Sequence, residues 1–157
     1  MRFQGETCDE ILNLARKEVA ATEEGLIFMH WPDADRAGHI HGWESTAYER
    51  KVRAMDASLE RLVQALDLTR RIDTLLVVCS DHGGGGVCPT EHNSNHPVDT
   101  TIPIVLAGAG IRATHLGPDV TLLDLPATIL WALGVEIPSS YVGRPLQEAF
   151  FREAWAA

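Results

Sequence analysis

The chain has 157 residues, and 13 Lys and Arg against 22 Asp and Glu give a formal net charge of -9 at pH 7. A hydrophobic share of 45% with 22% charged residues is typical of a globular protein and excludes a disordered chain. The acidic balance lacks the basic footprint of a nucleic-acid-binding protein, and no apolar run approaches the roughly 20 residues of a membrane-spanning helix. We therefore expect one domain over residues 1–157, with no nucleic-acid or membrane partner. The absence of a basic and apolar leader favours a cytoplasmic location.

The N-terminal half predicts two helices and one strand. The first helix follows Thr7, because Thr7-x-x-Glu10 forms a capping box and apolar residues then recur on one face through Val19. The segment 26–29 is apolar on both faces, which predicts a short buried strand. The segment 44–66 is the clearest helix, since its apolar residues follow steps of three and four.

The C-terminal half predicts two strands, over 74–79 and 102–107, separated by a polar, Gly-rich stretch over 83–100. A helix starts at Asp124 and ends before Gly134, and a last helix runs from Leu146 through Trp155. Strands separated by a long helix favour a parallel βαβ unit, so the predicted fold class is α/β with a parallel sheet. Ligands of such sheets bind at the carboxyl ends of the strands.

Polar residues follow the first predicted strand. Asp35 and His39 are four residues apart, with Gly38 between them permitting a tight turn. A carboxylate and a neutral imidazole are a normal pair of zinc or manganese ligands. The alternative is a polar loop that caps the next helix, because D-x-x-x-H by itself is a weak pattern.

Two further clusters flank the Gly-rich stretch. Asp81 and His82 end the second predicted strand, and they can converge on one ion only if the chain turns sharply at the glycines that follow. That glycine run is not a P-loop, because no Gly-Lys-Ser/Thr follows it. His92 or His96, ahead of the third predicted strand, could complete a ligand set, although a single loop histidine is usually only solvated. Three loops that bring Asp, His, Asp, His and His to one sheet edge favour a metal site.

The combined motifs resemble a known superfamily. Asp35-x-x-Gly38-His39, Ser80-Asp81-His82-Gly83-Gly84 and a His ahead of the segment Thr101–Val105 are similar to the alkaline phosphatase superfamily. More narrowly, the motifs are similar to its type I phosphodiesterase/nucleotide pyrophosphatase branch and its metalloenzyme-type phosphomutases. The ending, with Leu123–Leu130 and Gly143-Arg144-Pro145-Leu146, also resembles that family. The resemblance implies a three-layer sandwich around a parallel sheet.

The resemblance also implies a two-metal site that acts on small phosphate esters by in-line displacement. Asp35, His39 and a downstream His would hold one divalent ion, zinc or manganese, and Asp81 and His82 would hold the other. His92, eleven residues before Pro103, is favoured as the downstream ligand, while His96, seven residues before it, suits other branches. Related sulfatases tend to have Asn at the position of His82, which favours phosphate over sulfate esters.

Related enzymes place an Asp ligand and a Ser or Thr nucleophile near the N-terminus, in a segment that residues 1–25 do not match. Thr7 is better explained as a helix cap. We therefore expect this chain to be the C-terminal metal-binding part of an alkaline phosphatase-like catalytic domain, with most metal ligands but no nucleophile, and to be inactive alone. The rival functions are a non-catalytic metal-binding module and a fragment of a sulfatase-like sulfoesterase.

Overall fold

The computed structural model describes residues 7–22 and 24–151, and it shows a mixed α/β chain. The chain divides into two compact units. The first unit is drawn from Met1–Leu66 and His82–Ile102, and the second from Asp67–Asp81 and Pro103–Ala157. The expected α/β class is therefore confirmed at this level, while a single domain over 1–157 stays a prediction.

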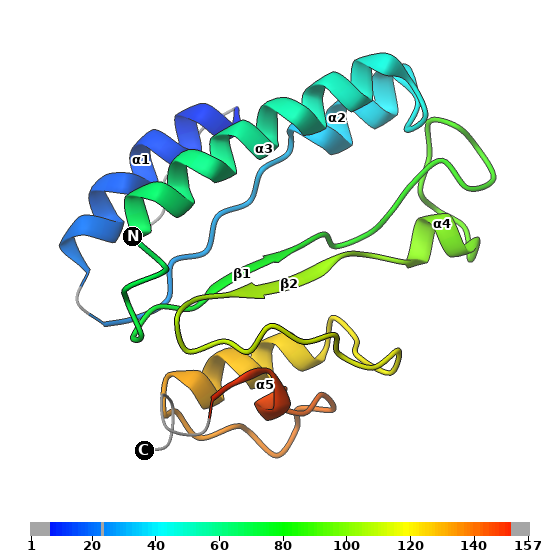
Figure 1. Cartoon of the computed structure of the whole chain (residues 1–157). Helices are drawn as coiled ribbons and strands as arrows, with labels where there is room; N and C mark the ends of the chain where they lie inside the picture. The colour runs from blue at the N-terminus through cyan, green and yellow to red at the C-terminus, as the bar shows by residue number, and fades with distance from the viewer. Residues whose placement is uncertain (1–6, 23, 152–157) are drawn as a thin grey trace. The chain divides into compact units, whose positions relative to one another are not determined.

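The first unit is helical, with α1 (Cys8–Ala21), α2 (Asp33–His41), α3 (Thr46–Leu66) and the short α4 (Pro97–Thr100). Both α1 and α2 pack against α3, α1 along its C-terminal half and α2 along its N-terminal half (Figure 1). Leu12 of α1 and Leu62 of α3 are each 1% exposed and form the centre of this packing. Of the apolar stripe predicted for 44–66, Leu62 and Leu66 are buried, whereas Val52 and Val63 are exposed. The helix α3 begins two residues later than expected.

Local signals and one buried carboxylate fix where these helices start. The Thr7 hydroxyl accepts a hydrogen bond from the Glu10 N–H, so the predicted cap of α1 is confirmed. Asp33, at the start of α2, is 6% exposed and accepts a 2.7 Å hydrogen bond from the Cys8 N–H. Lys51 Nζ of α3 lies 3.4 Å from its other oxygen. Asp33 therefore ties α2 to both other long helices and fixes the position of the residues that follow it.

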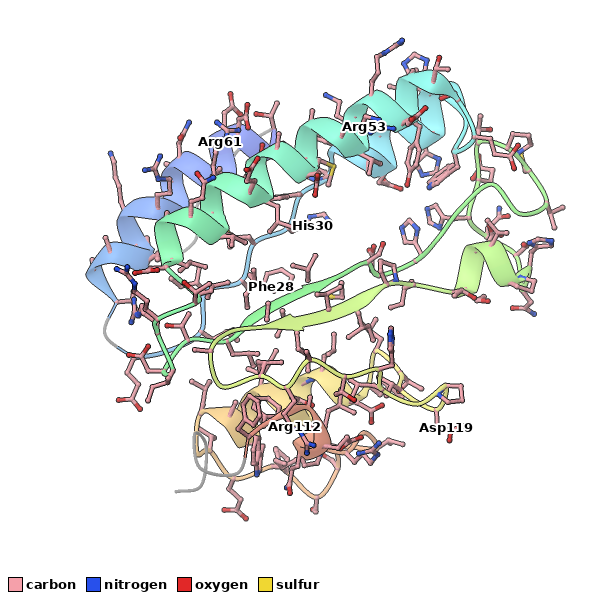
Figure 2. The ribbon with its side chains drawn as sticks, in the orientation of Figure 1. Phe28, His30, Arg53, Arg61, Arg112 and Asp119 are labelled. Carbon is pink, nitrogen blue, oxygen red and sulfur yellow. The ribbon has the colours of Figure 1, made fainter. Side chains whose placement is uncertain are left out.

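The strand predicted over 26–29 does not form in the described structure. These residues are assigned no secondary structure, and the Phe28 side chain, labelled in Figure 2, is 83% exposed. A strand exists only through hydrogen bonds to a neighbouring strand, which an apolar sequence favours but cannot supply by itself. The βαβ unit expected from this strand is accordingly not formed.

The second unit contains the two strands β1 (Leu76–Cys79) and β2 (Ile104–Ala107). They pair antiparallel, with Leu76 opposite Ala107 and Cys79 opposite Ile104. The expected parallel pairing is wrong for these strands, since the chain leaves β1 and returns along it in the opposite direction. The two strands form the whole sheet of the described residues, so a three-layer sandwich is not shown.

The helix α5 (Asp124–Ala132) confirms the one predicted from Asp124, with Gly134 just beyond its end. Asp124 accepts hydrogen bonds from the backbone N–H groups of Thr121 and Arg144, which holds the Gly143–Arg144 turn against the helix start. The helix expected from Leu146 is a 3-10 turn, Gln147–Ala149, and its predicted end at Trp155 lies outside the described residues. Among the described residues, no helix has the length and apolar character needed to cross a membrane.

Candidate metal centre

Three of the predicted ligands come together in the first unit. One ligand atom each from Asp35, His82 and His92 lies within 4.8 Å of the other two. Asp35 is on α2, His82 begins the Gly-rich loop and His92 lies in the same loop before α4. The helical spacing of α2 places His39 one turn after Asp35, on the same helix face. These residues, which are distant in the sequence, lie together because α2 packs against the Gly-rich loop.

One carboxylate oxygen is the centre of the cluster. Asp35 Oδ1 is buried and has no hydrogen-bond donor in the described structure. The Nε2 atoms of His39, His82 and His92 lie 3.4, 3.7 and 3.8 Å from it, respectively. A buried polar atom without a partner is rare and calls for a missing partner, such as a water or an ion.

The orientation of two of these imidazoles is fixed by backbone carbonyls. His39 Nδ1 lies 2.8 Å from the Thr90 carbonyl, and His82 Nδ1 lies 2.7 Å from the Gly83 carbonyl. A carbonyl can only accept, so each Nδ1 must be the donor, and in the neutral ring Nε2 then carries the lone pair. A carbonyl on Nδ1 is the usual arrangement of a histidine whose Nε2 binds a metal.

The cluster is therefore suited to a cation. Distances of 3.4 to 3.8 Å from Asp35 Oδ1 are longer than ordinary hydrogen bonds. Two ligands at about 2.0–2.1 Å from a tetrahedral ion stand about 3.4 Å apart, which is the separation of Asp35 Oδ1 and His39 Nε2. A carboxylate oxygen and imidazole lone pairs that converge at such spacing fit zinc or manganese. The carboxylate and the imidazoles of the cluster are therefore chemically suited to hold the divalent ion that the sequence motifs imply.

The Gly-rich loop supports this cluster, and its glycine N–H groups are used within the protein. Its four glycine N–H groups donate to backbone or side-chain acceptors within the loop or α4. Those of Gly83 and Gly84 bond to the Asp99 and Val98 carbonyls at 2.8 and 3.1 Å. A Cβ at Gly83 would overlap the Val98 carbonyl, and a Cβ at Gly84 would overlap the Trp43 ring. Both positions need glycine because these neighbours leave no room for a side chain.

Asp99 of α4 holds the loop closed. It is 3% exposed and accepts hydrogen bonds from the Ser94 hydroxyl, the Ser94 N–H and the Gly86 N–H. The Ser94 hydroxyl and then the Gly86 N–H lower the pKa of this carboxyl below its ordinary value. Nothing in the sequence pattern singled out Asp99. An Asp inside a short polar segment before a strand is too common to carry a signal.

The alternative ligand has another role. His96 precedes α4, and its Nδ1 accepts a 3.2 Å hydrogen bond from the Val98 N–H as a helix cap. His96 is exposed, whereas His92 contacts both other histidines of the cluster. This geometry favours His92. Asp81 is exposed and belongs to the second unit, so it stays a predicted ligand.

Aromatic residues that the sequence left unassigned flank the cluster. Trp43 contacts the rings of His39 and His92, and Tyr48 lies beside Trp43 with ring centroids 6.2 Å apart. Burial, and then the negative charge of Asp35, raise the pKa of Tyr48. The charge of Asp35 therefore acts on this side of the cluster.

Comparison with known proteins places the chain in a family. Residues 2–121 match the sequence model of the type I phosphodiesterase/nucleotide pyrophosphatase family. The chain belongs to this family, within the alkaline phosphatase superfamily, which confirms the resemblance found from its motifs.

Two relatives are named as enzymes whose substrates contain phosphate groups. The chain is 31% identical over 137 residues to a 2,3-bisphosphoglycerate-independent phosphoglycerate mutase from Vibrio vulnificus (strain YJ016), covering 85% of this chain and 26% of the relative. It is 24% identical over 165 residues to GPI ethanolamine phosphate transferase 1 from Gibberella zeae, covering 90% of this chain and 16% of that protein. The chain thus spans about a quarter or less of the length of these relatives.

Proposed function

We propose that this chain is the metal-binding part of an enzyme that hydrolyses or transfers phosphate esters with two divalent ions, zinc or manganese. The single observation that carries the proposal is Asp35 Oδ1, which is buried without a donor and faces three imidazole Nε2 atoms at 3.4 to 3.8 Å. Membership of the type I phosphodiesterase family supports phosphate esters as the substrate class.

The proposed ligands divide between two ions. Asp35, His39 and His92 would hold one ion, and Asp81 and His82 the other. Bound divalent ions supply a positive charge that stabilises a transferring phosphoryl group and its attacking oxygen. The 3.7 Å between His82 Nε2 and Asp35 Oδ1 supports neighbouring positions for the two ligand sets.

The residues of this chain would prepare and hold the ligands. Asp35 provides the negative charge, and the carbonyls of Thr90 and Gly83 keep the Nε2 lone pairs of His39 and His82 directed toward it. The Asp99 hydrogen bonds fix the loop that carries His92. In this proposal, none of these motifs supplies the attacking Ser or Thr. The chain spans 26% of the length of the mutase relative from Vibrio vulnificus.

Calorimetric titration of the chain with zinc and with manganese tests the proposal. The Asp35→Asn variant keeps the shape of the side chain and removes its charge, so we expect a loss of at least about tenfold in affinity for either ion. Asp119→Asn, an exposed carboxylate of the second unit (Figure 2), is the matched control and should bind like the wild type. Equal affinities of the wild type and Asp35→Asn would refute the metal centre.

A further inference from the structure

The three histidines of the cluster are held in different ways. His39 and His82 each donate Nδ1–H to a backbone carbonyl. In the described part of the chain, no hydrogen bond of this kind holds His92. Its ring is instead surrounded by other rings: His82 is stacked on it at 3.6 Å, and His39 and Trp43 have centroids at 5.1 and 5.8 Å. Ring packing, together with the Asp35 oxygen 3.8 Å from its Nε2, therefore sets the orientation of His92.

Trp43 is the one ring of this group that belongs to no predicted ligand. Its indole lies edge-on to both imidazoles, with planes 81° from that of His39 and 72° from that of His92. Edge-to-face contact is a favoured arrangement of aromatic rings. Rotation of either ring about its Cβ–Cγ bond would give up this contact. Trp43 thus touches one histidine with a hydrogen-bonded Nδ1 and one without.

The position of Trp43 is itself fixed by the backbone around it. A Cβ at Gly38 would lie 2.5 Å from the indole, and a Cβ at Gly84 would overlap it, so the ring fills a slot between α2 and the Gly-rich loop. The backbone N–H of Trp43 donates a 3.0 Å hydrogen bond to the Pro89 carbonyl. Gly42, with φ at 87°, makes the turn that brings Trp43 back toward α2. The slot leaves the indole little room to move.

We propose that Trp43 is the positioning residue of His92 and takes the place of the missing Nδ1 hydrogen bond. The indole, wedged between Gly38 and Gly84, holds the imidazole with its Nε2 toward Asp35. Without it, the His92 ring can rotate and the ligand set loses its geometry. This role rests on the proposed metal centre, but it concerns a residue that binds no ion.

The test compares two matched substitutions, Trp43→Phe and Trp131→Phe, by zinc titration. Each replaces an indole by a smaller ring, and Trp131 belongs to the second unit, where it packs on Phe150. We expect Trp43→Phe to weaken zinc binding about tenfold, the lower range for losing a group that orients a metal ligand, and Trp131→Phe to leave it unchanged. The visible spectrum of bound Co²⁺, which reports coordination geometry, should change only in Trp43→Phe. Far-UV circular dichroism verifies that each variant is folded. If Trp43→Phe does not fold, Trp43→Tyr is used in its place.

A double-mutant cycle separates positioning from general packing. If Trp43 acts through His92, Trp43→Phe should cause no further loss of zinc affinity in a His92→Ala background. An equal loss in both backgrounds, or wild-type zinc affinity and Co²⁺ spectrum in Trp43→Phe, would overturn the role of Trp43. A wild-type chain that binds no zinc would instead overturn the metal centre itself, so the two failures are distinguishable.

Discussion

The imidazole rings of His82 and His92 lie face to face, with centroids 3.6 Å apart and planes 12° from parallel. Both rings have Nε2 within 3.8 Å of the same oxygen of Asp35. Each ring therefore forms part of the surface that orients the other, and the two should behave as one unit in metal binding.

We expect His82→Ala and His92→Ala each to lower zinc affinity by at least about tenfold. The double variant should lose less than the product of the two single losses, because each single change already frees the remaining ring. Calorimetric titration of the four proteins measures this coupling, with His115→Ala, an exposed histidine of the second unit, as control. Losses that simply multiply would show that the stacking has no energetic consequence.

Gly84→Ala should destabilise the protein. The added methyl group overlaps the indole of Trp43, and overpacking of this kind costs about 1–3 kcal/mol in the free energy of unfolding. Gly117→Ala is the matched control, since nothing lies within 4 Å of a Cβ there, and it should change stability by less than about 0.5 kcal/mol. Urea unfolding followed by circular dichroism gives both values. Equal stabilities would mean that the loop yields freely around Trp43.

Asp99 should make the stability of the loop depend on pH. Its pKa in the folded chain is lowered, so its contribution is present above the ordinary value of about 3.9 and is lost as pH falls through the folded-state pKa. Asp99→Asn lacks this titration. Its deficit relative to the wild type should be present at about pH 6 and should shrink toward about pH 3, in matched urea unfolding experiments. A deficit that grows on acidification contradicts this sign.

The 157-residue chain should not turn over activated aryl phosphodiesters or monoesters at enzyme-like rates, even with zinc or manganese present. The double displacement implied by the family needs a side-chain nucleophile, and the expected motif has no match in residues 1–25. A chromogenic assay measures this, with an aryl sulfate as the comparison substrate. Turnover that disappears in His39→Ala would show that this chain carries a complete active site.

The helices with strong local signals were predictable from sequence. The Thr7 cap of α1, the apolar stripe of α3 and the Asp124 to Gly134 limits of α5 all depend on residues within a few positions of one another. The helix α2 was missed because Gly38 and the polar residues around it carry little helical signal. Its Ile40 is even 70% exposed. What fixes α2 is Asp33, which bonds to α1 and contacts α3 across the sequence.

The same division holds for the candidate site. The residue types of the site could be read from the sequence, since Asp35, His39, His82 and a later His form a metal-ligand pattern and a family motif. The sequence favoured His92 over His96 only through the family resemblance and did not single out Trp43, because both residues depend on which side of a folded loop faces α2. Spacing along the chain specifies contacts only within a helix turn or a tight turn. Contacts between α2 and the loop arise from packing of the Trp43 ring against Gly38 and Gly84, residues far apart in sequence that meet only when the chain folds.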